Sequence, residues 1–150
     1  YMTGFAKAIL ISILVATIFV VFTNFVMFFP WYMTLVYETY NLASVAANYN
    51  YLPKDEKEFI LNNLKTKPIF KECPEKIEIN SDREGDYSYE YYKDLDNSLK
   101  PYGQRGETFY VEIRAAFPFR IELAGSERSM DYEVSFRLTV TGIRYYKDLD

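Results

Sequence analysis

The stretch that decides the fold is Ala8–Phe29, whose sequence is AILISILVATIFVVFTNFVMFF. A helix needs about 20 apolar residues to cross the hydrocarbon core of a bilayer, and this stretch meets that requirement. No charged residue occurs from Ala8 to Tyr37, and Lys7 and Glu38 are the only charges in the first fifty positions. A secretory signal peptide has a shorter apolar region followed by a small-residue cleavage site. We therefore expect a retained, single transmembrane helix.

The charges around this helix predict its orientation. Lys7 and the terminal amine lie on its N-terminal side, so the positive-inside tendency places the N-terminus in the cytoplasm and the remaining chain outside. Four aromatic residues are then expected at the outer membrane interface, namely Phe28, Phe29, Trp31 and Tyr32. Because the chain starts with Tyr1 and Met2, we also expect that a leader has been removed upstream.

The helix is expected to continue beyond the membrane, with a kink near Pro30. The uncharged stretch is about 45 Å long at 1.5 Å per residue, whereas the hydrocarbon core is about 30 Å thick. Beyond Pro30, five apolar or small residues fall on one helical stripe, with Tyr40 and Ser44 opposite. The stripe consists of Leu35, Leu42, Val45, Ala46 and Tyr49. It must pack on protein, either on the chain's own remaining part or on neighbouring copies.

The rest of the sequence predicts a polar body. Lys54–Lys65 reads as a short amphipathic helix, and residues 76–80 alternate like a strand before a turn at 81–86. Tyr87, Tyr89 and Tyr91 also alternate. Residues 109–123, with a break at Pro118, and residues 132–140 predict an antiparallel hairpin with one buried face and a turn at Gly125 and Ser126.

The expected fold class is therefore α+β, with a long N-terminal helix, a short helix and a small antiparallel sheet. Residues 1–52 form the expected hydrophobic helix and residues 53–150 the extracytoplasmic head. The hexapeptide Tyr-Tyr-Lys-Asp-Leu-Asp occurs at 91–96 and again at 145–150. Because the flanking residues differ, it does not indicate a repeat architecture.

Composition excludes several classes of function. The chain has no histidine and one cysteine, Cys73, which excludes His-based catalysis, Cys/His zinc sites and an internal disulfide. The formal net charge is −4, so nucleic acid is not expected as a primary ligand. No catalytic, cofactor or metal residues are predicted, and we expect that the protein is not an enzyme.

Some alternatives stay open at this stage. Acidic residues in 82–86 and 94–98 can bind calcium, although neither run has the spacing of a calcium loop, and solvated turns are favoured. The glycines of 103–106 are read as a plain turn. Aromatic residues make up 19% of the chain. They are read as packing groups rather than as a sugar-stacking platform or an electron path.

The long apolar N-terminal helix, its polar continuation and the β-rich C-terminal part together resemble the type IV pilin superfamily. The layout is closest to TadE-like pilins and pseudopilins of tight-adherence systems, although Phe5 stands where those families usually carry glutamate. The resemblance implies processing by a prepilin peptidase, assembly by pilus machinery and a helical homopolymer outside the cell. The cytoplasmic membrane would hold the subunit before assembly.

We accordingly expect a structural subunit of an extracellular filament that acts in cell adhesion as a fimbrium. The alternative is a minor pseudopilin, or a single-pass module that forms no filament. The residues predicted to pack subunits together are Phe5, Lys7, Leu10, Leu14, Ile18, Phe22, Phe25, Phe29, Leu35, Glu38, Leu42 and Val45. Glu38 lies on the apolar stripe, so it should be at least partly buried when helices pack together, and we expect Lys7 or the Tyr1 amine of a staggered neighbour to supply the cation it then needs. The alternative is a Glu38 turned toward solvent, with Lys7 only a topology signal.

Overall fold

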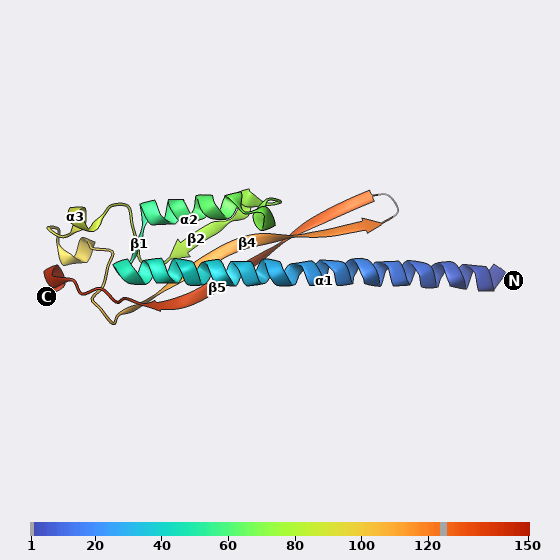
Figure 1. Ribbon diagram of the computed structural model, residues 1–150, viewed down its shortest axis with the longest axis horizontal. Helices are drawn as coiled ribbons and strands as arrows, with labels where there is room; N and C mark the ends of the chain where they lie inside the picture. Colours follow the sequence, from blue (N-terminus) through green and yellow to red (C-terminus); the bar gives the residue numbers. More distant parts are fainter. Residues whose placement is uncertain (1, 124–125) are drawn as a thin grey trace.

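The computed structural model describes residues 2–123 and 126–150 and confirms the α+β class. A long helix, α1 (Met2–Tyr49), runs along the whole molecule beside a short helix, α2 (Lys54–Thr66), and a three-stranded antiparallel sheet (Figure 1). A third helix, α3 (Tyr89–Tyr92), is a single turn. Further 3-10 turns cover Pro68–Phe70, Pro74–Lys76, Asn97–Leu99 and Lys147–Leu149.

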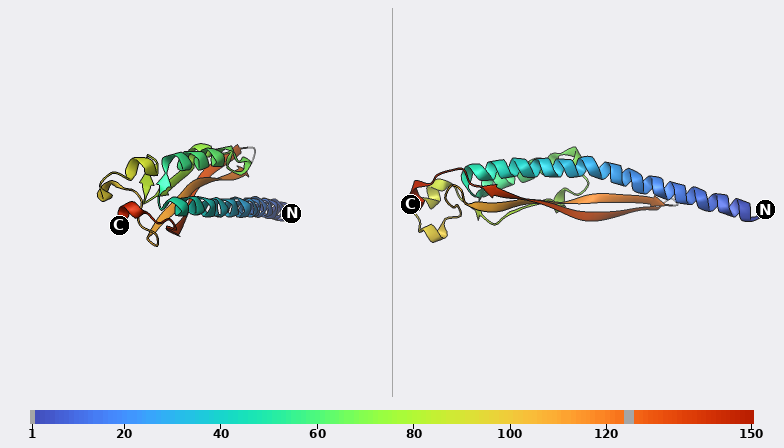
Figure 2. Two further views of the ribbon diagram at one scale, coloured as in Figure 1. Left: turned by 60° about the vertical axis from the view of Figure 1, so that its left-hand side comes forward. Right: turned by 90° about the horizontal axis from the view of Figure 1, so that it is seen from below.

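Helix α1 continues through Pro30 without interruption and bends in its middle part (Figure 2). Proline has no N–H to donate to the preceding turn, so one carbonyl there loses its helical partner and bending is favoured. The helix ends at Tyr49 because Asn50 adopts a left-handed conformation, with φ of 64°. The buried Asn50 amide donates to the carbonyls of Gly103 and Arg144 and accepts from the Arg144 N–H. This residue therefore ties the end of α1 to the C-terminal segment.

The sheet has the order β2-β4-β5, formed by β2 (Glu78–Ser81), β4 (Thr108–Leu123) and β5 (Ser126–Thr141). β4 and β5 form the predicted hairpin, paired over their whole length from Thr108 with Thr141 to Leu123 with Ser126. Ser126 opens β5, and Gly125 of the predicted turn lies outside the described residues. Two shorter strands, β1 (Leu52–Pro53) and β3 (Glu84–Gly85), pair in parallel, so β3 lies within the predicted turn 81–86.

The predicted break at Pro118 is wrong, because β4 passes through this residue and pairs it with Asp131. The backbone of Arg120, two residues further on, bonds to the side chain of Asn24 in α1 rather than to β5. Positions 118 and 120 present their backbone to the same edge, since orientation repeats every second residue. The N–H that Pro118 lacks would therefore point away from β5, so the ladder between β4 and β5 loses no hydrogen bond.

The alternation of Tyr87, Tyr89 and Tyr91 does not form a strand, since Tyr89–Tyr92 is the helix α3. A second cluster of buried residues explains this local structure. We call it the tyrosine cluster, and it consists of Tyr51, Tyr92, Tyr102 and Tyr146. A helical turn at α3 places Tyr92 in this cluster and leaves Tyr91 exposed.

The two copies of the hexapeptide make equivalent contributions to the tyrosine cluster. The second tyrosine of each copy, Tyr92 or Tyr146, is buried, whereas the first is exposed. Leu95 and Leu149, the fifth residues, both pack against the cluster. Both copies of the hexapeptide therefore contribute a tyrosine and a leucine to the same cluster. The C-terminal segment and the α3 region are held to the head by equivalent contacts.

The molecule has two layers, with α1 and α2 side by side on one face of the sheet (Figures 1 and 2). The main core joins both layers and crosses the expected boundary at residue 52. Its buried members are Trp31, Leu35, Leu42, Ala46, Leu52, Leu64, Phe70, Ile77, Ile79, Phe109, Val111, Ile113, Ala115, Phe117 and Val140. The second half of α1 is thus part of the head's hydrophobic core.

Three of the four aromatic residues expected at the membrane interface belong to this core region. Trp31 is 2% exposed and packs edge-on against Phe70 and Phe117. Phe28 packs against the same Phe117 ring at 5.1 Å, and Tyr32 against Phe136 at 6.4 Å. The head therefore covers Trp31 completely, which withdraws it from lipid, whereas Phe28 and Tyr32 are half-buried and their position at a membrane interface stays a prediction.

Candidate functional site

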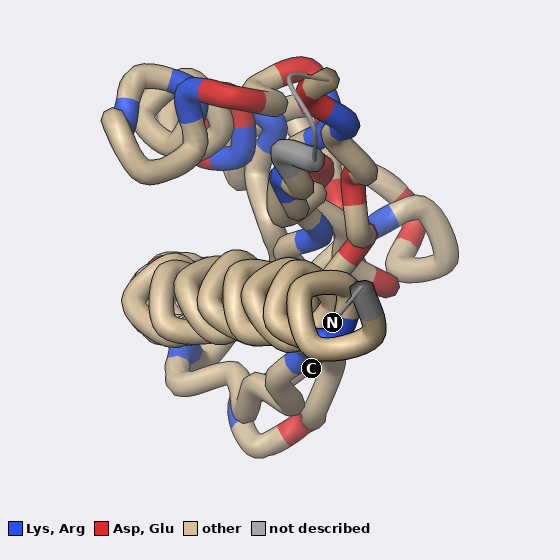
Figure 3. Tube along the Cα trace, turned by 90° about the vertical axis from the view of Figure 1, so that its right-hand side faces the viewer, with Lys and Arg blue, Asp and Glu red and all other residues tan. Residues whose placement is uncertain are grey.

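The predicted packing residues fall into two groups according to what covers them. Eight of them lie exposed along the N-terminal part of α1: Phe5, Lys7, Leu10, Leu14, Ile18, Phe22, Phe25 and Phe29. Leu35, Glu38 and Leu42 are buried by the chain's own head, and Val45 is half-buried. α1 is therefore long and apolar enough to cross a membrane over its first half. It carries almost no charge, whereas both signs of charge are spread over the head (Figure 3).

A second apolar stripe follows a largely exposed face of α1, and two of its members also approach the hairpin: Phe25 faces it, and the Tyr40 ring lies 6.2 Å from that of Phe136. The side chains of the stripe are 55–63% exposed. We call it the outer stripe, and its members are Phe22, Phe25, Phe29, Met33, Tyr37 and Tyr40. Their spacing of three or four residues places them on one side of the helix. Beyond Tyr40 the same face carries the polar residues Asn41, Ser44 and Asn48. Phe22, Phe25 and Phe29 are among the predicted packing residues. The sequence analysis missed Met33, Tyr37 and Tyr40, because beyond Pro30 it placed the packing face on the stripe that contains Leu35 and Leu42.

Glu38 has a cation from its own chain. The Lys67 ammonium, just after α2, lies 3.1 Å from the Glu38 carboxylate, whose side chain is 11% exposed. Glu38 is thus buried by the head of its own chain, and burial between neighbouring helices is not needed to explain its pairing. The reason for requiring a neighbour's Lys7 disappears, because Lys67 already neutralises the carboxylate. Pairing with a neighbour's Lys7 stays a prediction, and Tyr1 lies outside the described residues.

Asn24 of α1 forms hydrogen bonds to the β4–β5 hairpin, near the end where the two strands connect. Its Nδ2 donates to the Arg120 carbonyl at 2.6 Å, and its Oδ1 accepts from the Arg120 N–H at 3.1 Å. An amide side chain thus imitates the edge of a neighbouring strand. The sequence analysis did not single out Asn24. Its polar amide within an apolar run could have indicated this contact, because a polar side chain in apolar surroundings needs a hydrogen-bonding partner.

An apolar groove of about 440 Å³ lies beside the hydrogen bonds between Asn24 and Arg120. α1 contributes Val21, Phe25 and Phe28 to its walls, and the hairpin contributes mainly Phe117, Phe119, Met130 and Tyr132. Met130 and Tyr132 are 69% and 67% exposed. The groove therefore extends the apolar surface of the membrane-length segment onto the outer part of the hairpin.

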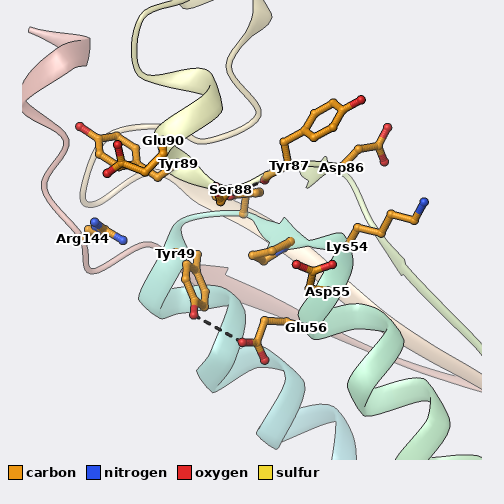
Figure 4. A pocket seen from close by; sticks show the side chains of 12 residues that line it. Tyr49, Lys54, Asp55, Glu56, Asp86, Tyr87, Ser88, Tyr89, Glu90 and Arg144 are labelled. Atoms are coloured by element: carbon orange, nitrogen blue, oxygen red, sulfur yellow. Dashed lines mark hydrogen bonds between the residues drawn. The ribbon is translucent and has the colours of Figure 1, made fainter.

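The opposite end of the molecule carries a mixed aromatic and charged pocket of about 280 Å³ (Figure 4). The Tyr49 hydroxyl donates to Glu56 at 3.4 Å within it. Asp86 and Arg144 lie at opposite ends of the pocket in Figure 4, so its charged groups do not converge on one point. Such a surface suits solvated polar contacts better than a reaction that needs convergent groups.

Below this pocket, polar contacts fix the tyrosine cluster. Asp148 accepts hydrogen bonds from Lys100, Tyr102 and Tyr89. Burial opposes the charge of Asp148, but these donors outweigh it and hold the pKa of this carboxyl below its usual range. Burial raises the pKa of Tyr51 to about 12. These contacts therefore keep the C-terminal segment bound to the head.

Among residues 2–123 and 126–150, no group of three or more Cys, Asp or Glu is arranged to hold a metal ion. Comparison with protein-family models, with curated proteins and with solved structures found no match.

Proposed function

We propose that this protein is a structural subunit that polymerises through α1 into an extracellular, pilus-like filament. Before assembly, α1 holds it in the cytoplasmic membrane as a single-pass protein. Copies of the same chain are the partners, and a prepilin peptidase and pilus machinery process and assemble them. The observation that carries this proposal is the outer stripe, a charge-free and mostly aromatic surface that continues from the apolar N-terminal run onto the part of α1 that packs against the head.

Part of the outer stripe lies beyond the length of helix that a membrane anchor requires. α1 has 48 residues and is about 72 Å long, whereas one bilayer core is about 30 Å thick. The outer stripe runs from Phe22 to Tyr40, and its last four members, from Phe29 to Tyr40, cover about 17 Å beyond the length that a bilayer core takes from Ala8. A helix that only anchored a soluble head would present polar residues over this length, because water would face them. The exposed aromatic side chains indicate a protein partner instead.

The character of the outer stripe favours a second copy of α1 as this partner. The stripe contains no charge, so two such surfaces can pack without burying an unpaired ion. Each large side chain that moves from half-exposed in water to buried contributes on the order of 1 kcal/mol, so the four stripe members from Phe29 to Tyr40 contribute about 4 kcal/mol per contact face. The members inside the membrane contribute through packing alone. A filament repeats this contact along its length, and the N-terminal halves of α1 then fill its interior.

Electron microscopy of surface material sheared from cells tests the proposal. We expect filaments composed of this chain, and we expect Tyr37→Asp to abolish them while the membrane-bound subunit stays folded. Asn48→Asp is the matched control, because it places the same charge on the same exposed face beyond the outer stripe, and filaments should persist.

Two results would count against the filament. One is a surface without filaments in cells that contain the folded, membrane-bound chain, which would favour the non-polymerising single-pass module. The other is normal filament yield with Tyr37→Asp, which would exclude the outer stripe as the contact.

A further inference from the structure

We propose that a neighbouring copy of this chain docks its outer stripe in the apolar groove between α1 and the β4–β5 hairpin. We call this site the hairpin groove. Its walls are formed by Val21, Phe25 and Phe28 of α1 and by Phe119, Met130 and Tyr132 of the hairpin. The partner is thus a second copy of the chain, and the proposal rests on the filament stage of the proposed function.

A copy inside a filament has neighbours on two sides, and these neighbours need two different surfaces. α1 is about 72 Å long, whereas the outer stripe covers only about 27 Å of it. Two neighbouring helices of that length cannot both lie along one stripe, because the rest of each helix would occupy the same space. Two identical stripes that met would therefore close a pair, and the polymer would not continue. The filament requires a second apolar surface elsewhere on the molecule.

The hairpin groove supplies such a surface. On β5, Met130 and Tyr132 lie on the same face as Phe136, which packs against the main core. Toward the end of the hairpin where the two strands connect, the strands separate from α1 (Figure 1). Met130 and Tyr132 are therefore left more than half exposed. Apolar side chains that are exposed together in this way mark an interaction surface.

Phe25 joins the hairpin groove to the outer stripe. It is a member of the stripe, and it also lines the groove. Val21 and Phe28 are three and four residues away from it, on the side of α1 that faces the hairpin. A neighbour that docks in the groove therefore meets α1 only at the edge of the stripe. The rest of the stripe stays free for a copy on the other side.

The hairpin groove suits an occupant that is apolar and uncharged. Among the described residues that line it, only Asp131 is charged, and Lys76 neutralises it at 2.6 Å. A further charge that entered the groove would be buried without a partner. Tyr37 and Tyr40 of the outer stripe meet this requirement, because each combines an apolar ring with a hydroxyl that can donate to the Asp131 carboxylate.

The docking segment and the hairpin groove also have the same length. Along α1 the groove extends from Val21 to Phe28, a rise of about 10 Å. The stripe members from Met33 to Tyr40 cover about the same rise. Placing this segment beside the groove displaces a parallel neighbour by about twelve residues, or about 18 Å along the axis. Tyr37 of the neighbouring copy then lies at the middle of the groove.

Cysteine cross-linking of filaments on cells tests this register. Cys73→Ser provides a background without cysteine, and Tyr37→Cys and Met130→Cys are then introduced together. A short bismaleimide is applied to the filaments, and the products are separated under denaturing conditions. We expect a ladder of multimers, because each copy is joined to one neighbour through position 37 and to another through position 130.

Two controls make the ladder specific. Met130→Cys combined with Asn48→Cys should give no ladder, because position 48 lies on the same exposed face of α1 but beyond the outer stripe. Tyr37→Cys alone should stay monomeric. Dimers of that single variant would overturn the proposal, since they would show that two stripes pack on each other. Filaments of the Tyr37→Cys and Met130→Cys variant that give no ladder would overturn it as well.

A charge placed in the hairpin groove gives an independent test. Met130→Asp should abolish filaments, because docking would bury an unpaired carboxylate. The subunit itself should stay folded and resistant to protease, since Met130 is exposed in the single chain. Ser135→Asp is the matched control, because it places the same charge on the exposed opposite face of β5, and filaments should persist. A normal filament yield with Met130→Asp would contradict docking in the groove.

These variants separate this proposal from the proposed function. If the unmodified chain forms no filaments, both fail together. If filaments form and are lost with Tyr37→Asp but not with Met130→Asp, the outer stripe remains the contact of the filament and the hairpin groove alone is excluded.

Discussion

Removal of α1 from the head should abolish folding of the remaining chain. A fragment of residues 54–150 keeps helices α2 and α3 and the complete three-stranded sheet, but it loses β1 and the α1 side of the main core. Trp31, Leu35 and Leu42 are each at most 2% exposed in the intact chain. Burial of three such side chains contributes about 5 to 9 kcal/mol. Since a domain is stable by only about 5 to 15 kcal/mol, the fragment should be unfolded.

Circular dichroism and urea unfolding in mild detergent measure this effect. The fragment 24–150, which restores Asn24 and the buried face of α1, should show a cooperative transition. In that fragment, Leu42→Ala should lower the free energy of unfolding by about 2 to 5 kcal/mol, because it leaves a cavity in the core. Met33→Ala removes an apolar side chain of similar size from the exposed face, so it should change stability by no more than about 0.5 kcal/mol.

The reasoning would be refuted by a fragment 54–150 that unfolds cooperatively with the stability of 24–150. Equal losses from Leu42→Ala and Met33→Ala would refute it as well, because the burial of α1 would then not determine its contribution. Either result would restore the simpler division into a helix of residues 1–52 and an independent head of residues 53–150.

Three further perturbations test individual contacts. Burial raises the pKa of Tyr51 to about 12 in the folded chain, against about 10 when unfolded, so the stability that its neutral phenol contributes is present below about pH 10 and is lost as pH rises toward 12. A spectrophotometric titration should show cooperative alkaline unfolding, and a noncooperative titration near pH 10 would contradict this. Burial, assisted by its hydrogen bond to Asp131, raises the pKa of Cys73 to about 11, so this thiol should react with a disulfide reagent near about pH 8.5 only after unfolding. Fast labelling of the folded chain would count against it. Lys67→Ala should destabilise the chain by about 1 to 2 kcal/mol, a value reduced because Lys67 is partly exposed. A double-mutant cycle with Glu38→Gln should show coupling, and additive effects would argue against the ion pair.

Much of the fold was readable from local pattern. An uncharged apolar run predicts a long helix whatever it packs against, because its backbone groups bond within the segment. The amphipathic spacing of Lys54–Lys65 likewise predicts the short helix, observed at Lys54–Thr66. Alternation in residues 109–123 and 132–140 predicts the hairpin, since the period of two survives without knowledge of the partner strand.

The candidate site was less predictable, because burial depends on which surfaces meet. Leu35 and Tyr37 are both apolar neighbours on one helix, yet the head covers the first and leaves the second exposed. Lys67 and Glu38 are 29 positions apart in sequence, and only the packing of α2 beside α1 brings their charges to 3.1 Å. Local pattern contains no information on such a pair.

The sequence by itself determined that a helix of membrane length precedes a β-rich part, because hydropathy and periodicity are properties of consecutive residues. Only the tertiary structure decided where the head lies along that helix. Asn24 bonded to Arg120, Trp31 buried under Phe117 and Asn50 bonded to Arg144 fix this position. Each of these contacts joins segments more than 80 residues apart, and such contacts form only when the whole chain closes one core.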